Sequence, residues 1–262
     1  MCVLFIAWKR HPRYRVILAA NRDEFHDRPA SPAGVWPDMP NVAGGRDLLG
    51  GGSWLAVRSD GCFAAVTNVR EPASRRADAR SRGELVQNFA STPLPPVHYA
   101  RSVSSCGDQY NGFNLLLGDA DSLVYACNRH QPFLNELSPG IYGLSNGRLD
   151  SLWPKVIKGK QRFEGIVQED AVDPNALLDL LYDRDKATDS ELPDTGIGLE
   201  WERLLSPIFI QSPLYGTRAS TVLLVDHDDN VTLIERSFKP DATAEETRRI
   251  EFSNGALRQE SG

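Results

Sequence analysis

The second residue of the chain is a cysteine, placed where a single residue could supply both a nucleophile and its base. Cys2 follows Met1 directly and begins an apolar run that continues to Trp8. If Met1 is removed, Cys2 carries a thiol and a free α-amine. The amine titrates near pH ~8 and a thiol near ~8.5, so the amine can accept the thiol proton close to neutral pH. This chemistry suits attack on a carbonyl carbon.

Cys2 also has a plainer interpretation. Apolar strands often contain a small buried cysteine that only fills space, and its reactivity then has no role. The residue types and their spacing leave both interpretations open.

Several polar side chains stand where other strand-like runs end, and they could complete a site around a thiolate. They are Arg22 with Asp23, Asn68, Asn146 and Arg218. The ends of neighbouring strands meet at one rim of a sheet, so these side chains can converge. An arginine would favour the thiolate, and asparagine amides can donate to the oxyanion of a tetrahedral intermediate. Alternatively, the asparagines bind their own turns and the charges are solvated ion pairs.

The elements that would position these residues can be read from apolar spacing and turn residues. Strands are expected over residues 3–7, 16–20, 54–58, 62–68, 114–117, 123–127, 141–144, 222–225 and 231–235, and helices over 81–89, 98–106, 149–167 and 175–182. We expect loops over 26–52 and 183–200, the second a candidate lid, and either a helix or a strand extension over 242–252. The order of these elements along the chain, with strands first, helices next and strands last, favours one α+β domain over residues 1–262.

Composition excludes several classes of protein. A formal net charge of -6 argues against a nucleic-acid binder, which needs a basic footprint. Four scattered cysteines without a CxxC pair suggest neither a disulfide framework nor zinc, and the five histidines lack metal-ligand spacing. The chain contains no run long enough to span a membrane and no signal-peptide pattern. We therefore expect a cytoplasmic protein with no cofactor and no integral membrane segment.

A set of short motifs resembles one known family over nearly the whole chain. The motifs are Met1-Cys2, Asn21-Arg22-Asp23-Glu24, Gly51-Gly52-Ser53-Trp54, Thr67-Asn68-Val69-Arg70, Ser81-Arg82-Gly83, Gly112-Phe113-Asn114, Leu144-Ser145-Asn146 and Tyr215-Gly216-Thr217-Arg218. They resemble the NRDE family, whose eukaryotic members are called transport and Golgi organisation protein 2. The resemblance implies the N-terminal nucleophile hydrolase fold, a four-layer αββα sandwich similar to that of choloylglycine hydrolases and penicillin V acylase.

The resemblance also implies roles for the candidate residues. Cys2 would be the nucleophile, Arg22 and Asp23 would poise it, Asn68 and Asn146 would bind the oxyanion and substrate, and Arg218 would lie near the thiol. In those hydrolases two residues separate the arginine from the aspartate. Here Arg22 and Asp23 are adjacent, so on a strand their side chains face opposite ways.

Two classes of function follow from the resemblance. The first is an amidohydrolase that cleaves a non-peptide C–N bond of a small-molecule amide. The alternative is a non-catalytic protein that binds and traffics haem or a lipid or acyl-CoA ligand, with haem as cargo rather than cofactor.

Overall fold

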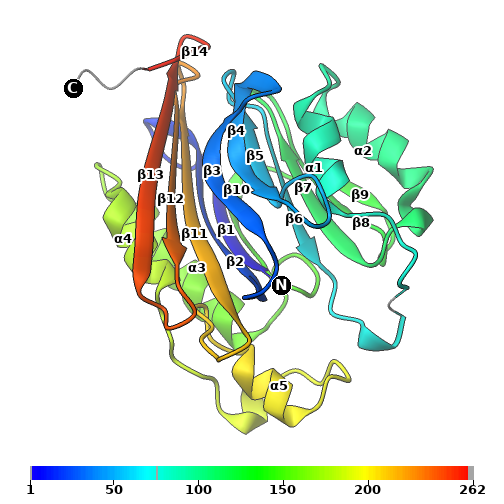
Figure 1. Ribbon diagram of the computed structural model, residues 1–262. Coiled ribbons are helices and arrows are strands. Elements are labelled where there is room, and N and C mark those ends of the chain that lie inside the picture. The colour runs from blue at the N-terminus through cyan, green and yellow to red at the C-terminus, as the bar shows by residue number, and fades with distance from the viewer. Residues whose placement is uncertain (1, 75, 259–262) are drawn as a thin grey trace.

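The computed structural model describes residues 2–74 and 76–258, and within them the strands form two seven-stranded antiparallel sheets (Figure 1). Sheet A has the order β10-β1-β2-β11-β12-β13-β14, with β10 (Gly140–Leu144), β1 (Cys2–Trp8), β2 (Tyr14–Phe25), β11 (Tyr215–Asp226), β12 (Val231–Phe238), β13 (Ala244–Ser253) and β14 (Ala256–Leu257). Sheet B runs in chain order, with β3 (Ala30–Trp36), β4 (Met39–Asp47), β5 (Leu55–Arg58), β6 (Phe63–Asn68), β7 (Phe113–Gly118), β8 (Leu123–Cys127) and β9 (Leu134–Glu136).

Helices cover the outer face of each sheet, which confirms the predicted α+β sandwich. The helices are α1 (Gly83–Ala90), α2 (Pro96–Ser104), α3 (Pro154–Val167), α4 (Pro174–Leu181) and α5 (Leu199–Leu204), with short 3-10 turns at Pro72–Ser74, Gly107–Gln109 and Asp189–Glu191. α1 and α2 pack on sheet B, and α3 and α4 pack on sheet A (Figure 1). The largest buried cluster lies between the sheets. The layers are therefore helix, sheet, sheet and helix.

Strand alternation assigns each residue to one of these layers. On β1, Leu4, Ile6 and Trp8 belong to the core between the sheets, whereas Val3 and Phe5 contact the helices. Successive side chains on a strand point to opposite faces, so a strand buried on both faces is apolar throughout. This explains why the first run of the sequence is continuously apolar.

The segment 26–52 was predicted to be a loop, and that prediction is wrong because the segment contains β3 and β4. β3 lies at the edge of sheet B, where Pro32 costs no ladder hydrogen bond, and its pairing with β4 is irregular between Ser31 and Gly34. Gly44 lies within β4, and a Cβ there would come within 2.5 Å of the Leu55 carbonyl oxygen. The glycine permits close strand packing, which local sequence cannot distinguish from a turn.

Two helices differ in how they begin. Asp173 accepts a hydrogen bond from the Asn175 main-chain N–H at 2.9 Å, and Pro174 is the first residue of α4. Ser81 and Glu84 have the spacing of a capping box, but α1 begins after Arg82 without a side-chain cap. The final segment, left open between helix and strand, is the strand β13.

Gly159 on α3 gives a stability test of the packing between α3 and β1. A Cβ at Gly159 would lie 2.1 Å from the ring of Phe5, which is completely buried and cannot move aside. We expect Gly159→Ala to lower the free energy of unfolding by about 1–3 kcal/mol, although alanine favours helices. Gly165→Ala is the matched control on the same helix, since nothing lies within 4 Å of its added Cβ. It should be stabilising by up to about 1 kcal/mol in denaturant titrations, and equal effects of the two would contradict the packing.

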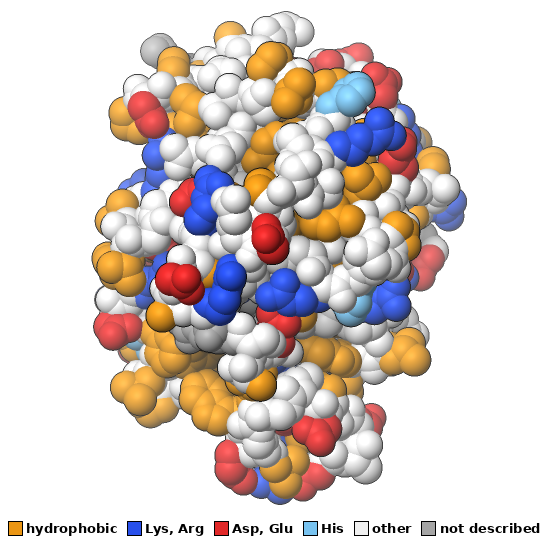
Figure 2. Space-filling view, turned by 90° about the vertical axis from the view of Figure 1, so that its right-hand side faces the viewer, with side chains coloured by type: hydrophobic (Ala, Val, Ile, Leu, Met, Phe, Trp, Pro, Cys, Tyr) orange, Lys and Arg blue, Asp and Glu red, His pale blue; other side chains and the backbone are white. Residues whose placement is uncertain are grey.

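The charged side chains of the described residues on the side where α1 and α2 lie are mixed rather than gathered into a basic area (Figure 2). Figure 2 shows acidic and basic side chains interspersed across that face, with apolar side chains between them. Among the described residues, no helix has the length and apolar character needed to cross a membrane.

Candidate active site

Cys2 and Arg22 are brought together by the pairing of β1 with β2. Their Cα atoms are direct partners in the antiparallel register, two residues beyond the pair Leu4 and Ala20 in the inter-sheet core. Directly opposed residues of an antiparallel pair place their side chains on the same face. The alternation therefore assigns Cys2 and Arg22 to the face between the sheets.

The surroundings of the partly buried Cys2 disfavour ionisation of its thiol. Burial raises the pKa of the thiol above its ordinary value, while a hydrogen bond from the Asp23 main-chain N–H and the charge of Arg22 oppose this rise. The Ser145 hydroxyl donates to the Cys2 carbonyl oxygen at 3.0 Å and ties the start of β1 to the end of β10. A thiol in this state is protonated at neutral pH and needs a base to react.

The Asp23 carboxyl lies on the opposite face of β2 from Arg22, as the adjacent spacing predicted. It is buried and accepts a hydrogen bond from the Thr217 hydroxyl at 2.7 Å, next to Lys155. Burial raises the pKa of this carboxyl, and the Lys155 ammonium opposes the rise. Asp23 thus reaches Cys2 through its main-chain N–H, and its carboxyl acts on the thiol through its charge.

Arg218 owes its orientation to a β-bulge in β11. Thr217 pairs with Asp23 and Ala219 pairs with Arg22, so Arg218 is an extra residue without a partner on β2. The extra residue shifts the alternation, which sends Thr217 to the helix side and Arg218 to the side of Arg22. The Arg218 Nη1 donates to the carbonyl oxygens of Phe25, His26 and Arg28 at 3.0–3.2 Å.

Asn68 and Asn146 lie next to each other, but their side chains are used differently. The Asn146 Nδ2 donates to the Asn68 carbonyl oxygen at 2.9 Å, so this buried amide already holds the end of β6. Within the described residues, the Asn68 side chain makes no hydrogen bond. The predicted pair of oxyanion donors is thus brought to one place, with Asn68 the amide that is free to donate.

A buried polar group that the sequence analysis did not single out as functional supports this end of the site. The Asn114 Nδ2 donates to the Gly147 carbonyl oxygen at 2.9 Å and to the Thr67 hydroxyl at 3.1 Å, and its Oδ1 accepts from the Tyr125 hydroxyl at 2.7 Å. The Thr67 hydroxyl in turn donates to the Ser145 carbonyl oxygen. The signal in the sequence was an asparagine inside the otherwise apolar run that forms β7.

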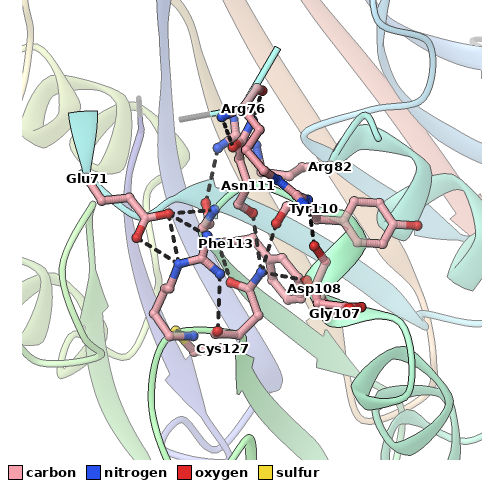
Figure 3. A network of polar contacts seen from close by, with 12 residues as sticks. Glu71, Arg76, Arg82, Gly107, Asp108, Tyr110, Asn111, Phe113 and Cys127 are labelled. Carbon is pink, nitrogen blue, oxygen red and sulfur yellow. Dashed lines mark hydrogen bonds and ion pairs between the residues drawn. The ribbon is translucent and has the colours of Figure 1, made fainter. Parts of the chain in front are cut away.

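A second network fixes the segment that follows Asn68 (Figure 3). Glu71 accepts from the Gly112 N–H at 3.0 Å and from the Arg129 Nε at 2.7 Å. Asn111 exchanges two hydrogen bonds with the main chain of Arg76, at 2.8 and 2.9 Å. These bonds anchor the connection from β6 to α1, so the Asn68 end of β6 has a fixed support.

The cavity beside Arg22 opens between the two sheets and has a volume of about 420 Å³. We call it the inter-sheet cleft. It is lined by Arg22, Ala30, Ser31, Pro32, Trp54, Arg218, Ala219, Glu235, Ser237, Phe238, Glu245 and Glu246. Cys2 is not among these residues and is connected to the cleft through its partner Arg22. No group of three or more His, Cys, Asp or Glu residues in the described chain could hold a metal ion.

An ion pair near Asp23 is isolated from solvent. It is formed by Arg70 and Glu202. The Arg70 Nη1 and the Glu202 Oε2 are 2.5 Å apart, and each side chain is 4% exposed. Burial lowers the pKa of the Arg70 guanidinium, and Glu202 opposes that shift. The Thr195 hydroxyl and N–H also donate to Glu202, which ties the segment predicted as a candidate lid to this pair.

Lys155 is a buried cation in the same region and was not identified from the sequence. Its Nζ donates to the Leu205 carbonyl oxygen at 2.9 Å, and burial lowers the pKa of its ammonium to about 8, partly offset by Asp23. Between that pKa and the ordinary value of 10.5, the unfolded chain binds more protons than the folded one. The free energy of unfolding should therefore rise with pH across this window.

The variant Lys155→Met lacks the titrating ammonium and so should lose the pH dependence that this group causes. The stability of the wild type relative to Lys155→Met is expected to increase by about 3 kcal/mol from pH 7.5 to 10.5 in denaturant titrations. Lys160→Met, on the same helix and more exposed, is the matched control for loss of a lysine. An unchanged difference between wild type and Lys155→Met over this range would show that Lys155 is not desolvated.

Comparison with known proteins identifies the family. A family profile described as Transport and Golgi organisation 2 matches residues 1–240. The chain belongs to the Transport and Golgi organisation 2 family. Its homologues in this family include the human Transport and Golgi organization protein 2 homolog, 37% identical over 97% of this chain and 99% of that protein. The mouse homolog is 36% identical with the same coverage, and the Drosophila melanogaster protein is 33% identical over 90% of this chain and 92% of its own.

The fold of this family member is similar to that of a solved hydrolase. The C2A mutant of conjugated bile acid hydrolase from Clostridium perfringens superposes with a TM-score of 0.54, covering 96% of this chain and 92% of that one at 8% identity. Both predicted resemblances, to the family and to the N-terminal nucleophile hydrolase fold, are confirmed. The catalytic roles of Cys2, Arg22, Asp23, Asn68, Asn146 and Arg218 stay predictions.

Proposed function

We propose that the protein cleaves a non-peptide amide by means of Cys2 after removal of Met1. The observation that carries the proposal is the pairing of Cys2 with Arg22 at the wall of the inter-sheet cleft. The similar fold of a hydrolase whose cysteine at position two was replaced by alanine supports it. The raised pKa of the Cys2 thiol explains why a base must be close, and the freed α-amine of Cys2 supplies it.

The reaction has two stages. The Cys2 α-amine takes the thiol proton, and the sulfur attacks the amide carbon while a hydrogen-bond donor such as the Asn68 amide holds the oxyanion. The C–N bond breaks, the amine leaves with the proton, and a Cys2 thioester remains. Water, deprotonated by the same α-amine, then attacks the thioester and releases the carboxylic acid and the thiol.

Trapping of the thioester tests this function. The protein starting at Cys2 is incubated with p-nitrophenyl butyrate, and intact-mass spectrometry records any added butyryl group. We expect one butyryl group on the wild type, located on Cys2 by peptide mapping, and none on that residue in Cys2→Ala. Cys106→Ala is the matched control and should acylate like the wild type. Absence of acylation at Cys2 would count against the proposal.

Binding and trafficking of haem or a lipid or acyl-CoA ligand is the alternative proposal. The inter-sheet cleft supports it, because a cavity of about 420 Å³ can hold a ligand whether or not Cys2 reacts. A titration with haem distinguishes the two, since a carrier should show a saturable Soret shift. A flat titration would remove the haem version of this alternative.

A further inference from the structure

Arg22 presents a buried guanidinium to the inter-sheet cleft without a hydrogen-bond partner in the described part of the chain. Its side chain is 5% exposed. The ring centroid of Trp54 lies 4.3 Å from its Cζ, and the nearest carboxylate oxygen, from Asp47, is 4.0 Å from Nη2. A guanidinium carries five N–H donors, and leaving these donors without hydrogen bonds in a buried place costs free energy. These donors are therefore available to a ligand in the cleft.

Arg218 contributes a second guanidinium to the cleft, and one edge of it is open to a ligand. Its Nη1 is fixed by three main-chain carbonyl oxygens, which leaves Nε and Nη2 without a partner among the described residues. These two nitrogens lie on one edge of the guanidinium, the geometry that binds both oxygens of a carboxylate. The β-bulge that turns Arg218 toward the cleft thus places a bidentate donor beside Arg22.

The acidic residues of the cleft do not neutralise these two arginines. Glu235 is buried in the wall, where it accepts from the Ala33 N–H at 2.6 Å and from the Thr221 hydroxyl at 3.1 Å. Glu245 and Glu246 lie on β13 with exposed side chains, and Glu246 pairs with Arg248. The nearby acids repel a dianionic phosphate more strongly than an anion of single charge, so a carboxylate fits the cleft better than a phosphate. The remaining lining, with Trp54, Pro32 and Phe238, offers apolar surface.

We propose that the inter-sheet cleft binds molecules with a carboxylate and an apolar body, the carboxylate held by Arg22 and Arg218 and the body lying against Trp54. Because Arg22 is the cross-strand partner of Cys2, a carboxylate there holds the rest of the molecule beside the nucleophile. The inference rests on the proposed function where it names the substrate class, amides that bear a carboxylate. Binding itself is independent of catalysis.

Matched pairs of acids and amides test the binding. The probes are hexanoate, phenylacetate and N-acetyl-L-phenylalanine, each compared with its primary amide by isothermal titration calorimetry on the Cys2→Ala protein. At least one acid should bind, and its affinity should exceed that of its amide by about tenfold to a hundredfold, the effect of a charge-assisted contact. Equal affinities within each pair, or no binding by any acid up to 10 mM, would overturn the proposal.

Variants locate the site and separate it from the catalytic proposal. Arg22→Gln and Arg218→Gln, each checked for a normal unfolding transition, should lose the preference for acids, and the exposed Arg10→Gln should keep it. A preference that survives both changes overturns the assignment. If acids bind but the wild type is never acylated and hydrolyses no amide, only the proposed function fails. If the wild type hydrolyses neutral and carboxylate-bearing amides equally well, only the substrate class fails.

Discussion

Replacing Glu202 by alanine is expected to lower the free energy of unfolding by about 3–5 kcal/mol, because it leaves the Arg70 charge buried without its carboxylate. The two side chains are each 4% exposed, so water cannot replace the lost partner. The change also removes the acceptor for the hydroxyl and N–H of Thr195, which loosens the segment before α5. Urea denaturation followed by circular dichroism measures the loss.

Two further variants show whether the loss of stability is specific to the buried ion pair. Glu200→Ala is the matched control, since Glu200 lies on the same helix with an 85% exposed side chain, and it should cost less than about 1 kcal/mol. The double variant Arg70→Met with Glu202→Met removes both charges and should recover part of the stability lost in Glu202→Ala. Equal losses in Glu202→Ala and Glu200→Ala would contradict a buried ion pair.

Retention of Met1 is expected to reduce amide hydrolysis by at least about a hundredfold, the usual contribution of a positioned general base. With Met1 in place, the nitrogen of Cys2 is part of a peptide bond and cannot take the thiol proton. Two proteins, one released from a cleavable leader so that it starts at Cys2 and one that retains Met1, are assayed with the same amides. Met1 itself lies outside the described residues, so the prediction depends on the chemistry of Cys2.

Alkylation gives an independent measure of the same difference. In the protein that retains Met1, iodoacetamide should modify Cys2 slowly at pH 7, and the rate should keep rising beyond pH 9.0, because burial raises the pKa of the thiol and only the thiolate reacts. In the protein that starts at Cys2, the rate should already be high near pH 8. The same rate profile in both proteins would exclude the α-amine as the base.

Much of the fold could be predicted because its signals are local. Asp60-Gly61 predicts the tight turn between β5 and β6, where Gly61 has a φ of +78° that other residues avoid. Asp173 and Pro174 predict the start of α4 within one residue. β3 and β4 were missed because Pro32 is tolerated at an edge and Gly44 is required by close packing, and both are properties of the neighbouring strand.

The sequence by itself determined which residues can do chemistry at this site: a cysteine able to become the first residue, and two arginines, an aspartate and two asparagines at the ends of strands. Only the tertiary structure decided how they are used. The bulge at Arg218, the burial of Lys155 and Glu235, and the engagement of Asn146 by the Asn68 carbonyl depend on contacts between segments 50 or more residues apart in the chain. Residue type and spacing describe one strand or helix at a time, whereas register and burial follow from how the two sheets and their helices pack together.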